Sequence, residues 1–181
     1  MLNQLRLGDH ICAPVTGAGA RLAVATAFTA EGMRDRQKVL LLVDRPATLL
    51  PRLCQQVAGG NVALARGQLR IDTSRDLFRA GHGRGQPAID RLTAEIDIAG
   101  REGYAGLRVL TDLTSAGPGD LDAGAVLDDE AAANAVWSTS QAMGVCHYRQ
   151  SCFDAGTWRR LVAVHPSTVV PEAKTIVGWM R

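Results

Sequence analysis

The sequence predicts an α/β domain in which helices cover both faces of a mostly parallel sheet. Short apolar runs alternate with segments of helical spacing along the chain, a pattern that implies parallel strands joined by right-handed helical crossovers. The run KVLLLVD (38–44) is unbroken and ends in an aspartate, which is typical of a strand buried on both faces. The chain has 181 residues, 46% of them hydrophobic and 21% charged, which fits a single globular domain over 1–181.

The first half of the chain supplies three predicted strands. The first contains GDHIC, the second is the 38–44 run, and the third is QLRID (68–72), whose alternation suggests a half-buried strand nearer an edge. Leu22, Ala25 and Phe28 recur at helical spacing, so a helix is expected from about residue 21 to 32. Further helices are expected over 49–57 and 61–67, with Gly59 and Gly60 between them.

The second half continues the alternation. The aperiodic, glycine-containing stretch 73–86 predicts a loop, helical spacing returns over 89–99, and AGLRVLTDLT (105–114) predicts another buried strand. After a turn or lid at SAGPGDLDAG (115–124), a helix is expected over 125–142, then the strand GVCHYRQS (144–151). Asp154 is placed to cap a last helix that ends before Pro166, and TVV (168–170) and TIVGW (175–179) suggest a final hairpin or edge pair.

Composition narrows the class of protein. The net charge is +2 and the arginines are scattered, so no direct nucleic-acid partner is expected. No apolar stretch approaches the roughly 18–20 residues that a membrane span requires, and the N-terminus lacks the pattern of a secretion signal. Four cysteines in mostly apolar patterns favour reduced thiols. We therefore expect a cytoplasmic protein with no membrane contact.

The segment TGAGARL (16–22) lies between the first strand and the first helix, where a P-loop would lie. A working P-loop follows its last glycine with lysine and then serine or threonine, which contact the phosphates and magnesium. Here Ala20, Arg21 and Leu22 follow Gly19, without the lysine and hydroxyl pair, so the sequence predicts a degenerate P-loop without ATP hydrolysis. Backbone amides at this helix start retain the capacity to bind a carboxylate or phosphate.

Several landmarks occur in an order that resembles a known family. GDHIC, KVLLLVD, LARGQL, GYAGLRVLTDLT, VCHYRQSCFD and the late His165-Pro166 pair together resemble the MEDS (methanogen/methylotroph, DcmR sensory) domain from about Leu7 to Val170. The resemblance implies a RecA/KaiC-like core without a working nucleotide site. It also implies a sensory module for small, hydrocarbon-derived ligands, used in signalling and transcription control.

The resemblance also implies site residues. His10 and Cys12 match the suspected ligand-contacting pair of the first strand. This chain departs from the family pattern at two places that concern the walls of the pocket. It has Asp112-Leu113-Thr114 where many relatives have an acidic residue followed by Met-Ser-Trp. On the following helix, only Glu130 clearly matches the acidic residues of the relatives. Many relatives carry a kinase, helix-turn-helix or other output domain. We expect none in this chain, and therefore expect a regulator, kinase or anti-sigma-type protein to act in trans.

Residues two apart in a strand face the same way, so His10 and Cys12 project together from the first strand. In a RecA-like order that strand neighbours VCHYR, which brings Cys146 and Tyr148, or alternatively His147, within reach. The set His10, Cys12, Cys146 and His147 would offer zinc its preferred nitrogen and sulfur ligands. Without a CxxC or HxxxH motif, we prefer a metal-free pocket and expect no required cofactor, because buried cysteines commonly act as small apolar residues.

Ligands of open parallel sheets bind outside the carboxyl ends of the strands, which selects the loops after Cys12, Asp44, Asp112 and Tyr148. The leading hypothesis is a non-catalytic sensor with His10 and Cys12 as the floor of the pocket and Tyr148 and Asp112 as its sides. Glu130 and Cys146 complete the predicted set of ligand-binding residues. The glycine-rich segments 79–86 and 115–124 are the expected lids, whose closure around a ligand would be read by the partner.

Three other interpretations remain at this level. The chain could be a ligand-free interaction scaffold that docks on a regulator or self-associates. It could be a metal-assisted or thiol-dependent enzyme acting on a small electrophile, with Cys12 as nucleophile and His10 or His147 as base, although no oxyanion-hole motif accompanies them. Cys146 and Cys152 could also form a reversible disulfide that acts as a redox switch.

Overall fold

A single parallel sheet organises the chain. The computed structural model describes residues 5–15, 17–74, 86–114 and 122–168. The strands are β1 (His10–Pro14), β2 (Lys38–Val43), β3 (Leu69–Thr73), β4 (Leu107–Asp112), β5 (Ala142–Tyr148) and β6 (Ser167–Thr168). They lie in the order β3-β2-β4-β5-β1-β6, and every pairing is parallel. The predicted parallel sheet is therefore confirmed, and β1 pairs with β5 as expected.

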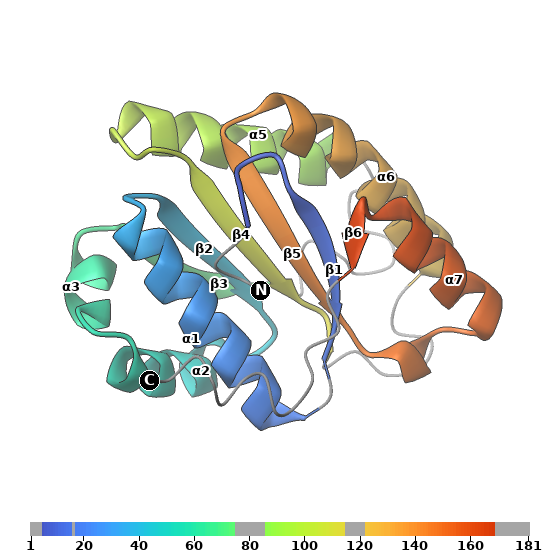
Figure 1. Cartoon of the computed structure of the whole chain (residues 1–181), viewed down its shortest axis with the longest axis horizontal. Coiled ribbons are helices and arrows are strands. Elements are labelled where there is room, and N and C mark those ends of the chain that lie inside the picture. The colour runs from blue at the N-terminus through green and yellow to red at the C-terminus, as the bar shows by residue number, and fades with distance from the viewer. Residues whose placement is uncertain (1–4, 16, 75–85, 115–121, 169–181) are drawn as a thin grey trace.

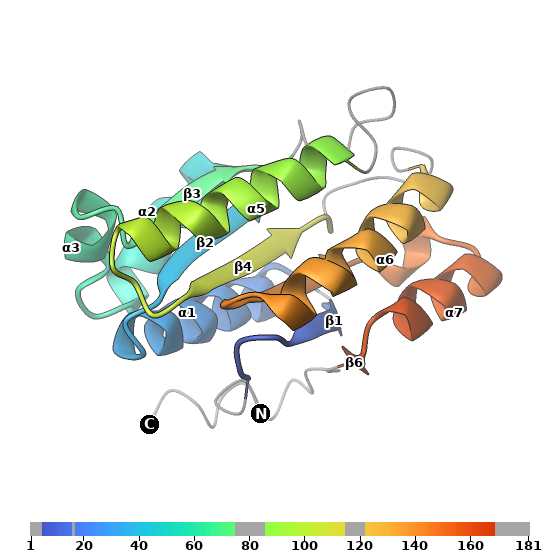
Figure 2. The same cartoon turned by 90° about the horizontal axis from the view of Figure 1, so that it is seen from above.

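Helices cover both faces of this sheet (Figures 1 and 2). One face carries α1 (Ala18–Arg34), α2 (Pro46–Gln56) and α3 (Gly60–Ala65), and the other carries α5 (Gln86–Arg101) and α6 (Ala123–Thr139). Helix α7 (Ala155–Val164) packs beside α6, after the short 3-10 helix η2 (Gln150–Cys152). The three-layer α/β sandwich predicted from the alternating pattern is confirmed.

Apolar clusters form on both faces of the sheet, because successive strand residues point to opposite faces. The α1 face buries Leu41, Leu110 and Val145 against Phe28, whereas the α5–α6 face buries residues such as Val109. Every residue of β2 and β5 is buried, which explains why the 38–44 run has no polar alternation. In β1 and β5, the side chains between those that pack on the α1 face therefore point to the other face, toward α6 and α7.

Helix ends follow local capping chemistry. Asp122 caps α6 by accepting hydrogen bonds from the amides of Gly124 and Ala125, so this helix begins two residues before the predicted start at 125. It ends at Thr139 rather than 142 because Ala142 already belongs to β5. Asp154 caps α7 as expected. Helix α1 begins at Ala18, three residues earlier than the apolar spacing indicates.

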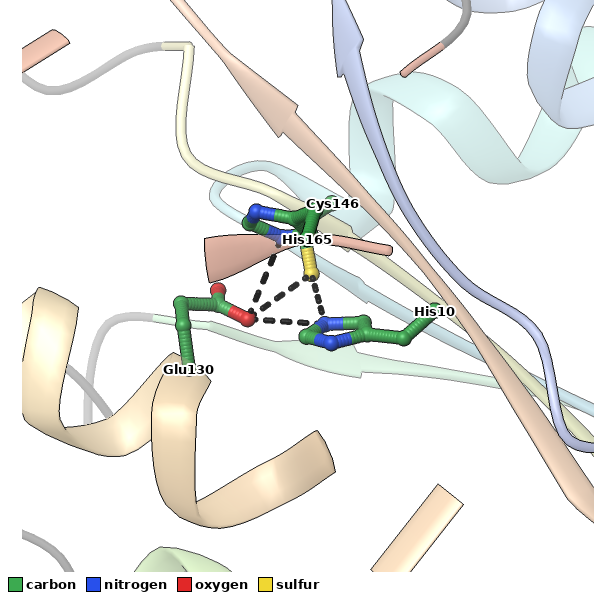
Figure 3. A group of neighbouring side chains, drawn as sticks. All are labelled: His10, Glu130, Cys146 and His165. Carbon is green, nitrogen blue, oxygen red and sulfur yellow. Dashed lines mark hydrogen bonds and ion pairs between the residues drawn. The ribbon is translucent and has the colours of Figure 1, made fainter. Parts of the chain in front are cut away.

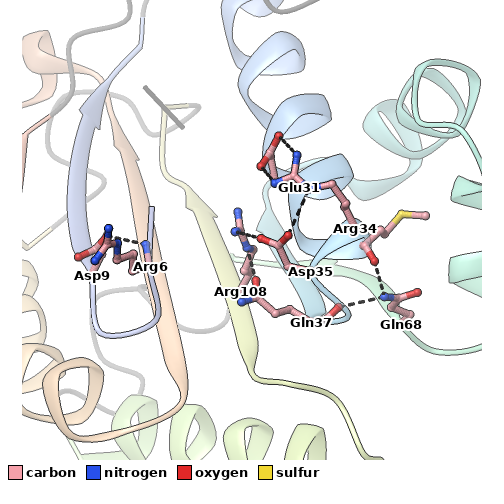
Figure 4. A network of polar contacts seen from close by, with 9 residues as sticks. Arg6, Asp9, Glu31, Arg34, Asp35, Gln37, Gln68 and Arg108 are labelled. Atoms are coloured by element: carbon pink, nitrogen blue, oxygen red, sulfur yellow. Dashed lines mark hydrogen bonds and ion pairs between the residues drawn. The ribbon is translucent and has the colours of Figure 1, made fainter. Parts of the chain in front are cut away.

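A partly buried polar network lies where α1 meets the sheet (Figure 4). Arg108 of β4 is 1% exposed; its guanidinium donates to the side chain of Gln37 and to Asp35 Oδ2 at 3.2 Å, and it lies 5.4 Å from the ring centroid of Phe28. Gln68 donates to the Gln37 carbonyl oxygen at 3.2 Å. The network joins the end of α1 to β4 and to the loop before β3.

Three predictions concern the ends of the chain and its loops. Residues 167–168 form β6, which pairs with β1. The choice between a hairpin and an edge pair for 168–170 and 175–179 is not tested, because residues 169–181 lie outside the described residues. Residues 175–179 and most of the predicted lids, 79–86 and 115–124, lie outside the described residues. Among the helices of the described ranges, none combines the length and apolar character needed to cross a membrane.

Candidate functional site

Four side chains that can ligate a metal converge between α6, α7 and the sheet (Figure 3). His10 is the first residue of β1, Cys146 lies in β5, Glu130 projects from α6, and His165 caps the end of α7. All four are buried. One ligand atom from each lies within 4.8 Å of the others. We call this group the His10 cluster.

The Glu130 carboxylate is the centre of the His10 cluster. Its Oε2 lies 2.8 Å from His10 Nε2 and 3.3 Å from His165 Nε2. The thiol of Cys146 lies 3.6 Å from both Glu130 Oε2 and His10 Nε2. On its other oxygen, Oε1, Glu130 accepts a hydrogen bond from the Tyr148 hydroxyl. A buried carboxylate is stable here because four polar groups surround it.

The outer nitrogen of each imidazole is held by a hydrogen-bond acceptor. His165 Nδ1 lies 2.8 Å from the carbonyl oxygen of Leu161, which can only accept, so Nδ1 carries a proton. His10 Nδ1 lies 2.6 Å from Asn134 Oδ1, while the Asn134 amide donates to the Val164 carbonyl oxygen at 2.7 Å. These contacts fix both rings with Nε2 turned toward Glu130.

The ionisation of the His10 cluster follows from its burial and its neighbours. Burial by itself raises the pKa of Glu130, but the interactions with the facing imidazoles of His10 and His165 outweigh it, and the pKa lies well below its usual range. Burial and the negative charge of Glu130 raise the pKa of Cys146 well above its usual range and do the same for the pKa of Tyr148. At neutral pH the cluster therefore holds a carboxylate beside a protonated thiol and a protonated phenol.

A cavity of about 80 Å³ opens beside the His10 cluster, between α5, α6 and the face formed by β2, β4 and β5. His10, Glu130 and Cys146 form one part of its lining. The apolar wall is supplied by both helices and the sheet: Leu40, Leu42, Ala88, Ile89, Leu92, Val109, Ala133 and Trp137. The remaining lining residues are polar: Arg91, Glu95, Thr111 and Asp129.

The structure places the residues that were predicted to share one pocket at different sites. His10, Glu130 and Cys146 line the cavity, whereas Tyr148 lies behind Glu130. Cys12 is fully buried and pairs with Cys146 in the β1–β5 register, but it does not line the cavity. Its pKa is raised to about 12, mainly by burial and also by the negative charge of Glu130. The cavity lies under α5 and α6, rather than at the loops beyond the carboxyl ends of the strands.

Asp112 lies on the opposite face of the sheet. It pairs in register with His147, while the preceding Thr111 pairs with Cys146 and lines the cavity. Asp112 accepts hydrogen bonds from the backbone and hydroxyl of Thr114, and it lines a separate groove of about 380 Å³ at the carboxyl edge beside α1. That groove also contains Arg21, Arg45, Arg52 and Arg149. Asp112 therefore does not form a side of the cavity.

His147 is likewise separated from the His10 cluster, because neighbouring strand residues point to opposite faces. The zinc set considered from the sequence, His10, Cys12, Cys146 and His147, is not brought together by the fold. His147 is 1% exposed and neither ring nitrogen has a hydrogen-bond partner. The pKa of His147 is lowered to about 4, mainly by burial. The charge of Asp112 opposes this shift, and the charge of Arg21 adds to it.

We predict that His147 makes stability depend on pH in the weakly acidic range. Its folded-state pKa lies below the ordinary value of 6.5, so the unfolded chain binds more protons between pH 6.5 and about 4, and the free energy of unfolding falls as pH decreases through this window. The loss reaches about 3 kcal/mol. Urea unfolding of the original chain and of His147→Leu, at several pH values, measures the difference. Parallel pH profiles for the two proteins would contradict this assignment.

Two contributors to the site escaped the sequence reasoning. His165 lies at the end of α7, as the following Pro166 indicates, but the packing of α7 against α6 also brings its Nε2 to Glu130. Asn134 orients His10 from one turn beyond Glu130. The four-residue spacing of Glu130 and Asn134 on one helix face could have indicated that Asn134 belongs to the site. No local sequence pattern connects His165 with these two residues.

Comparison with known families gives a match over most of the chain. Residues 9–166 match the family described as MEDS, the MEthanogen/methylotroph, DcmR Sensory domain. The chain belongs to this family of sensory domains. No curated protein matches the sequence.

Comparison with solved structures supports the fold. The chain is similar to a unique ATP synthase subunit, NeqB, from Nanoarcheaum equitans, with a TM-score of 0.55 and 10% sequence identity. The similarity covers 94% of this chain and 47% of the subunit, so the chain spans about half the length of that protein. This likeness supports the α/β fold of the chain, with one parallel sheet between layers of helices.

Proposed function

We propose that this MEDS-family chain is a non-catalytic sensor that binds a small hydrocarbon derivative in the cavity between α5 and α6. The observation that carries the proposal is the composition of the cavity wall. Apolar side chains surround most of the space, while His10, Glu130 and Cys146 present polar atoms at one end. Such a wall favours a ligand with a short apolar body and a polar atom, because a few placed polar groups orient a ligand in an apolar pocket.

The cavity size restricts the ligand. An apolar cavity of roughly 150 Å³ accommodates benzene, so 80 Å³ corresponds to about three or four heavy atoms. Two- and three-carbon alcohols, aldehydes and thiols have this size. Their oxygen or sulfur atom can exchange hydrogen bonds with the His10 cluster while the carbon chain contacts Leu42, Val109 and Trp137.

The state of the thiols supports binding rather than covalent catalysis. A thiolate is the nucleophilic form of cysteine, and catalytic cysteines have lowered pKa values. Here burial, followed by the charge of Glu130, raises the pKa of both Cys12 and Cys146. Both thiols therefore remain protonated at neutral pH, which disfavours a Cys/His-dependent enzyme. All four cysteines are free thiols, as a reducing compartment such as the cytoplasm favours.

We propose that helix α6 transmits ligand binding in the cavity to the protein surface. This helix supplies Glu130, Ala133 and Trp137 to the cavity and packs on α7, which ends at His165. A ligand that prefers one position of α6 shifts the population toward that position and changes the α6–α7 surface. We propose that a regulator, kinase or anti-sigma-type protein reads this surface in trans.

A cavity-filling variant tests the proposed ligand site. In Ala133→Leu the isobutyl side chain replaces a methyl group and occupies the cavity, and we expect the affinity for the best two- or three-carbon alcohol, aldehyde or thiol to fall at least about tenfold. Thermal unfolding with increasing ligand measures binding, because a ligand that binds the native state raises the unfolding midpoint. Ala132→Leu, on the exposed side of the same helix, is the matched control and should retain binding.

Two results would reject the proposal. One is that no compound of the series stabilises the original chain at any accessible concentration. The other is that a stabilising compound binds Ala133→Leu as well as it binds Ala132→Leu, which would place its site away from the cavity.

A further inference from the structure

We infer that His10, Glu130, Cys146 and His165 form a binding site for a divalent transition metal ion of the Zn²⁺ class. The inference deepens the proposed function and rests on it for its role, because three of these residues line the cavity. Metal binding itself can be tested without an organic ligand. The four residues differ from the set considered from the sequence by Glu130 and His165 in place of Cys12 and His147.

The donor atoms match the preferences of this class of ion. The cluster offers two imidazole nitrogens, one carboxylate oxygen and one sulfur, all buried. Zn²⁺ is bound in proteins by such nitrogen, sulfur and oxygen atoms, most often four at once. Ca²⁺ and Mg²⁺ prefer sites made of oxygen atoms and fit this donor set poorly.

The spacing of the donors also fits. Tetrahedral bonds of about 2.0–2.3 Å place neighbouring ligand atoms roughly 3.3–3.8 Å apart. The distances from Cys146 Sγ to His10 Nε2 and to Glu130 Oε2 are both 3.6 Å, and His165 Nε2 lies 3.3 Å from Glu130 Oε2. The separation of 2.8 Å between His10 Nε2 and Glu130 Oε2 is a hydrogen-bond distance, so an ion would move these two groups apart by about half an ångström.

The orientation of the two histidines supports the same conclusion. Metal-ligating histidines usually donate their other ring N–H to a carbonyl or carboxylate oxygen, which fixes the ring and its tautomer. His165 does so to the Leu161 carbonyl oxygen and His10 to Asn134 Oδ1. In the neutral rings, both Nε2 lone pairs point toward an ionised carboxylate. Three acceptor atoms that face one another require a cation between them, either protons on the imidazoles or a metal ion.

His165 shows that protons alone leave the cluster incompletely satisfied. Its side chain has no exposed surface, and Nε2 has no hydrogen-bond partner, since the 3.3 Å contact with Glu130 Oε2 lacks hydrogen-bond alignment. Buried polar atoms without a partner are rare in folded proteins and call for an unseen water or ion. A metal ion at the centre would engage this nitrogen together with the other three donors, with the Cys146 proton released to solvent on binding.

The site has a defined relation to the cavity. His10, Glu130 and Cys146 border the cavity, whereas His165 approaches from the α7 side. An ion held by these residues would lie at the polar end of the cavity. The oxygen or sulfur atom of a small ligand could then bind the ion directly, which would select compounds with a metal-binding atom over hydrocarbons without one.

Titration with Co²⁺ tests the site, because Co²⁺ occupies zinc sites and a bound thiolate gives it a charge-transfer absorption in the near ultraviolet. We expect the reduced, chelator-treated full chain to bind one Co²⁺ with this absorption, and Zn²⁺ to remove it by displacement. Absence of the thiolate band in the unmodified chain would overturn the inference, and that result does not depend on any variant folding.

Matched variants identify the ligands. Cys146→Ala should abolish the thiolate band, while Cys12→Ala, which removes another buried cysteine from the paired position of β1, should retain it. His165→Gln should weaken Zn²⁺ binding at least about 100-fold, since loss of an outer-shell partner alone costs 10–100-fold. His147→Gln removes a buried histidine from the opposite face and should leave the Zn²⁺ affinity unchanged. Loss of binding in the two controls but not in Cys146→Ala and His165→Gln would overturn the assignment.

The metal and the organic ligand can fail separately. If the alcohols, aldehydes and thiols bind with equal affinity in the presence of Zn²⁺ and of a chelator, and no thiolate band forms, the metal inference is wrong and the proposed sensor function stands. If the band forms but no compound of the series binds with or without Zn²⁺, the metal inference stands and the proposed function is wrong.

Discussion

Replacing Glu130 with alanine is expected to lower the free energy of unfolding by about 3–5 kcal/mol, the range for breaking a buried ion pair by removing one partner. The substitution takes away the acceptor of the Tyr148 hydroxyl and the carboxylate that faces His10 and His165. The buried Tyr148 hydroxyl then lacks its acceptor, and the two imidazole Nε2 atoms lose the carboxylate that they face. Urea unfolding of the metal-free, reduced protein measures the effect.

Two further variants separate this explanation from a general effect of altering α6. Glu130→Gln keeps the volume and an acceptor for Tyr148, so we expect a smaller loss of about 1–2 kcal/mol. Asp128→Ala, at an exposed position of the same helix, should change the free energy of unfolding by no more than about 0.5 kcal/mol. A loss below 1 kcal/mol for Glu130→Ala would show that the carboxylate does not organise the cluster.

The second large effect is expected at Arg108, on the other face of the sheet. Arg108→Ala removes one of the largest fully buried side chains and leaves the buried Gln37 side chain without its guanidinium donor. We predict a loss of about 3–5 kcal/mol, from the cavity and the unpaired group together. Thermal and urea unfolding of the variant measure this loss.

Arg108→Met tests which part of that loss comes from packing. One guanidinium nitrogen, Nη1, is buried without a hydrogen-bond partner, so an apolar side chain of similar length should recover most of the lost stability. Arg34→Ala is the matched control, because Arg34 pairs with Glu31 and Asp35 in the same region but its side chain is 62% exposed. Surface ion pairs contribute little, so we expect the free energy of unfolding of Arg34→Ala to stay close to that of the original chain. Equal losses for Arg108→Met and Arg108→Ala would show that the charge, and not the volume, matters at this position.

The fold was predictable because its signals are local and repeated. The 38–44 run is apolar without interruption since both faces of β2 are covered by helices, and Asp154 caps α7 as its position before an apolar helix indicates. Helix boundaries were less accurate. The apolar spacing marks where α1 and α6 become buried, whereas Ala18 and Ala123 begin these helices earlier, in more exposed turns.

The site was only partly predictable because it depends on register and on tertiary packing. Alternation along β1 and β5 placed His10 and Cys146 on a common face, as the paired register shows. The same alternation places Asp112 on the opposite face of the sheet, because Asp112 pairs with His147 and not with Cys146. The register between two strands is set by the packing of the whole sheet and cannot be derived from one strand alone. His165 reaches Glu130 through the packing of α7 on α6, and no sequence spacing encodes that contact.

Methyl-resolved NMR during titration with 1-propanol tests the central claim, binding in the α5–α6 cavity, most directly. We predict shifts concentrated at the methyl groups that line it, those of Leu40, Leu42, Ile89, Leu92 and Val109. Methyl groups of Leu41, Val43 and Val145, in the core under α1, should remain unchanged. Shifts confined to the α1 face, or no saturable shift at any methyl group, would contradict the account.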